Sequence, residues 1–437
     1  MKRDALLTII AEWLEEWEMP LLVPRNPSTV RPQDLKRILA IVGPRRAGKT
    51  CFMYQIIHSL LQDGRYSKKH ILFLDFEDYR LSELTGDTMD ELFTAFHQVA
   101  GQYPLFLFFD EIQNLPNWNR VLRTLHNRGQ FRIIVSGSNS KLLSSEIATE
   151  LRGRYEDILM LPFSFREYLE YRKISYTPAS LHTAARGNIL AAFDDYMKHG
   201  GFPEVVMAGT EMEQRKLVQG YFKTIFYRDI LERYNIKARY VLDALMNDIP
   251  ENYAGIFSIS RFEKQLKRSD LPGSKRTIAN YLHYLTEAFF VIANEKFSFS
   301  PRQRIMNPKK AYLTDTGFAT LGRPFTENRG RIIENIVAIE LFRRGMETYY
   351  FKNRNECDFI IKQGRRPKHA IQVCWELTGR NEKREIAGLV EACSLLGLTS
   401  GIILTYVQDE KREKDGLKIS VLPVWKWLLE ADKLYLP

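Results

Sequence analysis

The sequence predicts an α/β protein of several domains, and three observations lead to this fold class. Strand-like apolar runs alternate with helical patterns in the first third of the chain, and a glycine-rich phosphate-binding motif lies among them. A mainly helical region follows, and a second group of strands and helices occupies the last third. The chain has 437 residues, which at about 100–200 residues per domain corresponds to roughly two to four domains.

Composition and charge narrow the class of protein. Hydrophobic residues make up 45% of the chain and charged residues 27%, as in folded soluble proteins. The apolar runs are far shorter than the ~18 residues needed to cross a bilayer, and the acidic N-terminus does not resemble a signal peptide. The four cysteines form no CxxC pair, so we expect a cytoplasmic protein without disulfides, structural zinc or membrane contact. The net charge of +10 permits a polyanionic partner, although basic surfaces are often only solvated.

The first α/β unit follows an amphipathic helix over residues 4–17 and a proline-rich linker over 20–32. Its strands are apolar throughout, which indicates burial on both faces and therefore a parallel sheet with helices on each side. We expect strands at Arg37–Val42, His70–Phe76, Tyr103–Phe109 and Phe131–Ser136, and helices at Lys49–Gln62, Met89–Ala100 and Asn119–Asn127.

The segment from Gly43 to Thr50 reads G-x-x-x-x-G-K-T between a buried strand and an amphipathic helix, which is the context of a phosphate-binding loop. Its glycines let backbone N–H groups curl around phosphates, and the helix N-terminus adds a favourable dipole. Lys49 is expected to reach the β- and γ-phosphates of ATP, and the Thr50 hydroxyl to bind Mg²⁺. The alternative is a glycine turn that only joins strand to helix. The predicted nucleotide-binding residues are Gly43, Pro44, Arg45, Arg46, Ala47, Gly48, Lys49, Thr50, Cys51 and Ser138.

A second motif of this site is the apolar strand that ends in Asp110 and Glu111. Asp110 falls at the sheet edge where the phosphate loop also lies, so we expect it to hold Mg²⁺ together with Thr50. Glu111 is the predicted general base for the attacking water, and Lys49 is its predicted catalytic partner. The alternative is a solvated turn after a core strand.

Three nearby segments are candidates for supporting roles. The strand at 131–136 leads into Ser136-Gly137-Ser138-Asn139, where one side chain could hydrogen-bond the γ-phosphate or the attacking water, or cap a helix instead. Arg152 and Arg154 are candidate arginine fingers, in cis or from a neighbouring copy, or else part of a basic surface turn. The acidic segment 75–78 could assist Mg²⁺ or position water, or form a plain turn at the strand end.

Residues 254–300 have the order of a winged helix-turn-helix. Helices are expected at Ile259–Lys267 and Ser274–Phe290, the second capped by Ser274, followed by a strand pair at Phe290–Asn294 and Lys296–Ser300.

The charge of this region suits contact with DNA. It holds seven basic and four acidic residues, and Lys275 and Arg276 begin the second helix, the end that enters a major groove. Thr277 and Asn280 could then face bases or phosphates. The alternative is a helical module that packs domains together or binds protein, with its basic residues solvated.

The last part of the chain resembles the PD-(D/E)xK nuclease fold. Helices are expected at Arg331–Arg344 and Lys383–Leu396, among strands at Thr348–Lys352, Asp358–Lys362, Ala370–Trp375 and Gly401–Tyr406. The active pattern needs two or three carboxylates around Mg²⁺ and a Lys that steadies the attacking water, with the acid and the Lys on one face of a strand.

This pattern is damaged here. Glu334 and Asp358 are candidate ligands of a second metal ion, but Gln372 stands where the second acid belongs and Cys374 where the Lys belongs. The missing cation could instead come from the helix that follows, where Lys383 and Arg384 are the candidates. We therefore expect a non-catalytic domain, with a retained nuclease activity as the alternative.

Taken together, these segments resemble the AAA-type ATPases of archaea and bacteria that carry a C-terminal DUF4143 domain. The similarity extends from about residue 24 to residue 408 and implies the architecture and ATP binding of that family. The segments that carry it are the phosphate loop, Leu74–Asp78, Phe109–Gln113, Val135–Ser140, Leu151–Arg154, Gly200–Pro203, Tyr312–Gly317 and Glu356–Phe359.

The expected organisation is a helix and linker over 1–30, a P-loop AAA-like core over 31–165, a helical lid over 166–240, a winged-helix module over 241–305 and a nuclease-like domain over 306–437. The expected function is that of an ATPase that uses ATP and Mg²⁺ and associates with double-stranded DNA. The alternatives are a nucleotide-switched regulator that binds protein partners without DNA, and an ATP-gated nuclease. A homo-oligomer is an expected assembly, because an arginine finger can come from a neighbouring copy.

Overall fold

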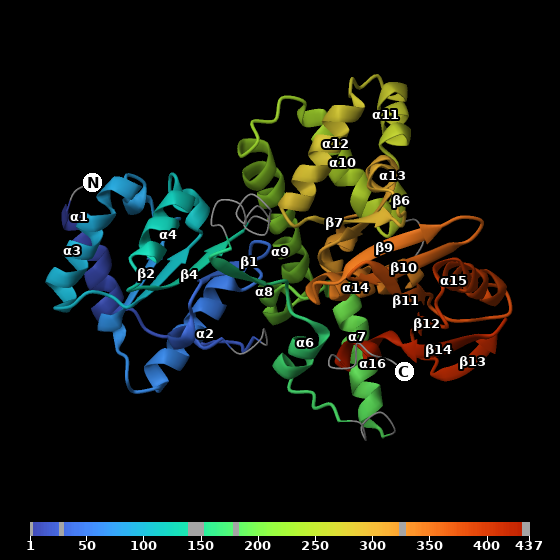
Figure 1. The fold of residues 1–437 in the computed structure, drawn as a ribbon, viewed down its shortest axis with the longest axis horizontal. Coiled ribbons are helices and arrows are strands. Elements are labelled where there is room, and N and C mark those ends of the chain that lie inside the picture. The colour runs from blue at the N-terminus through green and yellow to red at the C-terminus, as the bar shows by residue number, and fades with distance from the viewer. Residues whose placement is uncertain (1–2, 26–29, 139–152, 178–182, 323–328, 431–437) are drawn as a thin grey trace. The chain divides into compact units, whose positions relative to one another are not determined.

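The computed structural model describes residues 3–25, 30–138, 153–177, 183–322 and 329–430 (Figure 1). The chain divides into two compact units, Met1–Leu161 and Pro162–Pro437. In the described part of the chain, no helix is both long enough and apolar enough to cross a membrane.

The first unit is built on a five-stranded parallel sheet in the order β2-β3-β4-β1-β5. All residues of the central strands β1 and β3 are buried, because helices cover both faces of the sheet, and the predicted parallel sheet is thereby confirmed. The fifth strand was not predicted, since its sequence YEDIL is half exposed at the sheet edge and contains no apolar run. The strands are β1 (Ile38–Val42), β2 (Ile71–Asp75), β3 (Phe106–Asp110), β4 (Arg132–Gly137) and β5 (Tyr155–Leu159).

Four α-helices of this unit agree closely with the predicted helical patterns. The N-terminal helix α1 contacts α3 and continues into a π-helical turn at Glu12–Glu16, where the Trp13 indole N–H donates to the carbonyl of Ile71 at 2.6 Å. Helix α2 begins directly at the end of the glycine-rich loop. The helices are α1 (Arg3–Ala11), α2 (Lys49–Gln62), α3 (Met89–Ala100) and α4 (Trp118–Asn127).

The second unit contains a nine-stranded mixed sheet in the order β13-β14-β12-β11-β10-β9-β7-β8-β6. Pairing of β7 with β9 joins the three strands of the central module to the strands of the C-terminal part, so that one sheet runs through the unit (Figure 1). The strands are β6 (Gly255–Phe257), β7 (Val291–Lys296), β8 (Lys309–Leu313), β9 (Glu347–Lys352), β10 (Glu356–Gln363), β11 (Arg366–Val373), β12 (Ser400–Thr405), β13 (Glu410–Lys414) and β14 (Leu417–Pro423).

Helices precede and cover this sheet. Helix α6 contacts α16, and α7 contacts α14, so the helices after residue 162 belong to the second compact unit. They are α6 (Phe165–Tyr171), α7 (Ala185–His199), α8 (Pro203–Met207), α9 (Glu211–Thr224), α10 (Arg239–Asn252), α11 (Ile259–Arg268), α12 (Lys275–Glu287), α13 (Pro301–Met306), α14 (Arg329–Arg343), α15 (Glu382–Leu396) and α16 (Val424–Leu429).

The predicted strand pair at 290–294 and 296–300 was wrong in its second strand. Strand β7 runs on to Lys296, and its antiparallel partner is β8, which lies beyond helix α13. Pro301 occupies the first turn of α13, where its missing N–H and fixed φ favour helix over strand. The connection between β7 and β8 is therefore a longer loop that contains a helix, rather than a tight turn.

Candidate functional site

The glycine-rich loop joins the buried end of β1 to the first residue of α2. A Cβ atom at Gly43 would meet the carbonyl oxygen of Met160 at 1.9 Å, so only glycine fits this close approach. Gly48 has a φ of 90°, in the left-handed region that glycine adopts without strain. Arg46 has a φ of 64°. The loop therefore has the curled backbone that a phosphate-binding loop requires.

Lys49 is almost fully buried, with 4% of its surface exposed. Its ammonium donates to the carbonyl of Pro44 at 3.1 Å and lies 3.4 Å from a carboxylate oxygen of Glu111. The two predicted catalytic residues are thus brought together, although 62 positions separate them in the sequence.

Asp110 is the centre of a hydrogen-bond network between strands. The Thr50 hydroxyl donates to Asp110 Oδ2 at 2.6 Å, and the Ser136 hydroxyl donates to Oδ1. Strand β4 lies between β1 and β3, which is why Ser136 can reach the carboxylate. Burial raises the pKa of Asp110, the Glu111 carboxylate adds to this rise, and the two hydroxyl groups oppose it.

Glu111 is held from several sides. Its backbone N–H donates to the Ser136 hydroxyl at 3.0 Å, and the Gln113 amide donates to its carboxylate. Burial opposes ionisation, but the Lys49 ammonium and the Gln113 amide outweigh it and lower the pKa of Glu111 to about 2. A φ of 50° is uncommon for a residue other than glycine and persists where surrounding contacts hold it.

The donor set fits Mg²⁺, because a hydroxyl and a carboxylate are oxygen ligands of the kind this ion prefers. Thr50 and Asp110 converge at the loop, as the sequence predicted. In the described residues, no group of three or more His, Cys, Asp or Glu side chains is arranged to hold a metal ion. Protein ligands alone would thus supply part of the coordination shell, with water and phosphate oxygens completing it.

The remaining predicted residues of this site differ in their burial and in their position along the sheet. Ser138 is buried near the Gln113 amide, 3.5 Å from it, whereas Cys51 is exposed on α2. Arg154 precedes β5 at the amino end of the parallel sheet, where its carbonyl accepts from the Ile38 N–H, and the phosphate loop follows the carboxyl end of β1. Arg152 lies outside the described residues.

The acidic segment after β2 meets the phosphate loop. Arg45 of the loop forms an ion pair with Glu77 at 2.7 Å, and the Glu77 N–H donates to Asp75 Oδ1 at 2.8 Å. Burial raises the pKa of Asp75 to about 6, with the nearby Asp110 adding to the rise. Sequence reasoning missed the Arg45 pair and the Gln113 contact; the position of Gln113 two residues after Glu111 was the one local signal.

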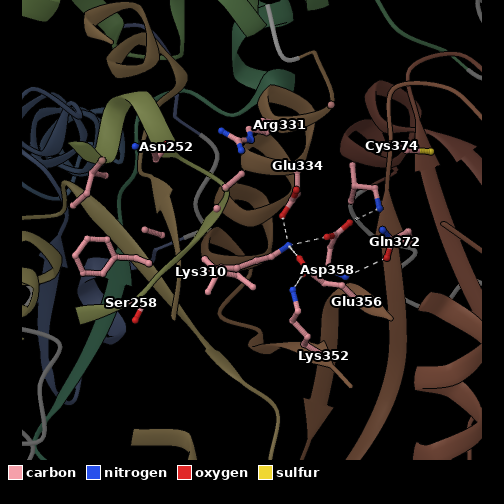
Figure 2. Close-up of a pocket in the computed structure, with 18 of the residues that line it drawn as sticks. Asn252, Ser258, Lys310, Arg331, Glu334, Lys352, Glu356, Asp358, Gln372 and Cys374 are labelled. Atoms are coloured by element: carbon pink, nitrogen blue, oxygen red, sulfur yellow. Dashed lines mark hydrogen bonds and ion pairs between the residues drawn. The ribbon is translucent and has the colours of Figure 1, made fainter. Parts of the chain in front are cut away.

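The second unit brings the nuclease-like residues into one cluster, shown in Figure 2. The Lys310 ammonium, from β8, lies 2.9 Å from Glu334 and 2.8 Å from Asp358. Gln372 donates through its amide to Glu385 at 2.7 Å. Lys310 was not among the sequence candidates for the missing cation, because these were sought on the strand at 372–374 and on the helix that follows it, and β8 precedes both in the sequence.

Of those candidates, Arg384 contacts Glu385 and so lies at the edge of the cluster, and Lys383 is exposed on α15. Cys374 is buried beside the cluster, and burial raises the pKa of its thiol to about 12. The thiol is therefore neutral at ordinary pH, and because a thiol carries no positive charge at any pH, Cys374 does not supply the missing cation.

The central module has the element order α10, β6, α11, α12, β7, α13, β8. Ser274 caps α12 as predicted, since its hydroxyl accepts from the Thr277 N–H at 3.1 Å. Lys275, Arg276 and Asn280 are exposed on α12, whereas Thr277 is half-buried.

Fold and site together define a protein with the P-loop fold of AAA-type ATPases. Residues 35–169 match the family model described as an AAA domain, residues 190–326 a domain of unknown function (DUF8612), and residues 329–427 the domain of unknown function DUF4143. The chain belongs to the family of AAA-type proteins that carry a DUF4143 domain, as its resemblance predicted.

Two proteins are similar in sequence to nearly the full length of this chain. An uncharacterized protein of Methanocaldococcus jannaschii is 35% identical over 405 residues, which cover 90% of this chain and 88% of the relative. An uncharacterized protein of Haemophilus influenzae is 28% identical over 404 residues, covering 91% and 96%. Among solved structures, a Walker-type ATPase of Pyrococcus abyssi is similar with a TM-score of 0.43 and 14% identity, covering 66% of this chain and 91% of that one.

Proposed function

We propose that the chain binds and hydrolyses ATP at the glycine-rich loop. The observation that carries this proposal is the contact of Thr50 with Asp110 at 2.6 Å, beside the buried pair of Lys49 and Glu111. These four groups are the parts that phosphoryl transfer by a P-loop protein needs: a cation for the phosphates, two ligands for Mg²⁺ and a base for water.

The roles follow from the chemistry of each group. Bound Mg²⁺ would neutralise charge on the phosphate oxygens, held by Thr50 and Asp110. The Lys49 ammonium lies 3.4 Å from a carboxylate oxygen of Glu111. The phosphates of ATP compete for this ammonium, which frees the Glu111 carboxylate to accept a proton from the attacking water while Gln113 keeps it oriented.

An arginine finger would come from a second copy of the chain. Arg154 lies at the amino end of β5, and the loop lies beyond the opposite end of β1, so this residue is far from the loop of its own chain. We therefore propose Arg154 as a residue that acts in trans, in a homo-oligomer.

One experiment tests both proposals. Phosphate release from ATP is measured at several protein concentrations, with Mg²⁺ and with excess EDTA. Release should require Mg²⁺ and stop in EDTA, and the rate per chain should rise with protein concentration. Absence of hydrolysis in Mg²⁺ would contradict the ATPase proposal, and a rate per chain that is independent of concentration in a strictly monomeric preparation would remove the in-trans role of Arg154.

We also propose that the central module binds double-stranded DNA through α12. Its first turn exposes Lys275 and Arg276, and Asn280 is exposed one turn further along. Cations at the start of a helix that follows a turn suit contact with phosphates and with the major groove. Two helices followed by the antiparallel pair β7 and β8 resemble a winged helix-turn-helix in which helix α13 lies between the two strands.

Changing Lys275 and Arg276 together to Ala should reduce the affinity for duplex DNA about tenfold or more at low salt, because two phosphate contacts are lost. The slope of log affinity against log salt should fall by roughly two. The matched control changes Lys411 and Lys414, which are exposed on β13, and should bind like the wild type. Equal binding by both double variants would exclude α12 as the contact, and absence of DNA binding by the wild type would favour a nucleotide-switched regulator that binds protein.

A further inference from the structure

The second unit contains a polar cleft of about 1130 Å³. Several of its basic lining residues are exposed, whereas the lining carboxylates of Glu334, Asp358 and Glu385 are buried. Figure 2 shows Glu334, Glu356 and Asp358 pointing toward Lys310. The exposed basic residues include Arg261, Lys352, Arg354 and Arg384. The floor is built around Lys310, which has 2% of its surface exposed.

Three carboxylates converge on the Lys310 ammonium. Glu334 Oε1 lies at 2.9 Å, Glu356 Oε1 at 2.8 Å and Asp358 Oδ1 at 2.8 Å. Glu334 comes from α14, and the other two flank Cys357 at the start of β10, where an irregularity in the pairing with β9 begins. One cation from β8 thus binds oxygen atoms from a helix and from a strand.

Second contacts fix each of these carboxylates. The Tyr312 hydroxyl donates to Glu334 at 2.8 Å, and the backbone N–H of Val373 donates to Asp358 Oδ2 at 2.9 Å. Lys352 contacts the second oxygen of Glu356 at 2.9 Å. Outer partners of this kind orient the ligands of metal centres, and here they orient the partners of an ammonium.

The charges explain why a cation is required. Three carboxylates around one ammonium would repel one another if the ammonium were removed, and an unpaired buried charge is strongly destabilising. Burial lowers the pKa of Lys310, but Asp358 and Glu334 outweigh this effect and raise the pKa well above its ordinary value. The ammonium therefore stays charged at any ordinary pH.

We propose that Lys310 is the resident cation of this cluster and occupies the position that a divalent metal ion takes between carboxylates in a metal centre. The floor of the cleft is then complete without metal, and the cleft is a metal-independent binding site rather than a nuclease centre. Removal of the ammonium would expose a site for a divalent ion with oxygen ligands, of the class of Mg²⁺ and Mn²⁺. This inference does not depend on ATP hydrolysis or on DNA binding by α12.

The test compares Lys310→Met with the wild type by thermal unfolding of the nucleotide-free full chain, in EDTA and in Mn²⁺. Met fills similar space without charge, so the variant should unfold at a lower temperature in EDTA. Mn²⁺ at about 100 times its Kd should then raise the midpoint by roughly 5 °C or more, whereas the wild type should not respond. The matched control is Lys309→Met on the same strand, whose ammonium pairs with Glu295 outside the cluster; it should behave like the wild type.

Two further measurements make the result decisive. The double variant Lys310→Met/Asp358→Asn should lose the response to Mn²⁺, because a converging carboxylate is gone. Should Lys310→Met be unfolded in EDTA, refolding in Mn²⁺ should recover folded protein. The proposal is overturned if neither state of Lys310→Met responds to Mn²⁺, or if the wild type shows a response that Asp358→Asn abolishes. Metal-dependent cleavage of DNA by the wild type that is lost in Lys310→Met would also overturn it.

Discussion

Replacing Glu111 by Gln should leave ATP binding intact and slow phosphate release by about 10²–10⁴-fold, the usual contribution of a positioned base. Gln has the same shape, so Thr50 and Asp110 keep their contact at 2.6 Å. The Lys49 ammonium loses its anionic partner at 3.4 Å and becomes more available to the phosphates. Binding is measured with a fluorescent ATP analogue and hydrolysis by phosphate release.

Lys49→Ala is the paired variant, and it should remove binding as well as hydrolysis, because the cation of the loop is lost. Lys69→Ala serves as the control: this lysine is exposed just before β2, at the amino end of the sheet, and should not affect either measurement. Wild-type hydrolysis by Glu111→Gln would assign the base elsewhere, with Glu77, which pairs with Arg45, as the next candidate.

The elements of the first unit were predictable because their local patterns agree with their burial. Helices α2 and α3 begin and end where the apolar spacing placed them, and the buried strands β1 and β3 carry continuous apolar runs. The edge strands β5 and β13 lacked this signal, since most of their side chains are exposed or half-buried. Strand β14 has the alternating burial of a half-buried strand and was missed. Periodicity reports burial on one or both faces, and an exposed edge strand has neither pattern.

The candidate nucleotide site was predictable because each of its parts lies in a short motif at the end of a buried strand, whereas the Lys310 cluster was not. The acid and the Lys of the nuclease pattern were sought on one strand, at 372 and 374. The cation instead comes from β8, which reaches the cluster because β7 pairs with β9 and so brings both parts into one sheet. The spacing of residues along the sequence does not predict such a contact, because the order of the strands in the sheet determines which side chains meet.

Two glycine-containing segments of the family resemblance meet inside the second unit. The Asp315 carboxylate accepts from the N–H groups of Gly201 and Gly317, both at 2.8 Å, and has 3% of its surface exposed. Gly200 ends α7 with a φ of 78° and a ψ of −164°, a conformation that other residues rarely adopt. A Cβ atom there would meet Asp315 Oδ1 at 1.8 Å. This junction therefore fixes α7 against the segment that follows β8.

Gly200→Ala should accordingly destabilise the second unit by about 3 kcal/mol or more, since the strained backbone costs about 1–3 kcal/mol and displacement of Asp315 breaks buried hydrogen bonds. Gly220→Ala is the matched control with the opposite sign. Gly220 lies within α9 with nothing inside 4 Å of its added Cβ, so Ala should stabilise that helix by about 0.5–1 kcal/mol. Chemical denaturation of both variants and the wild type measures the difference. Equal stability of Gly200→Ala and the wild type would show that Asp315 and α7 do not approach so closely, because no side chain can share the space of a carboxylate oxygen.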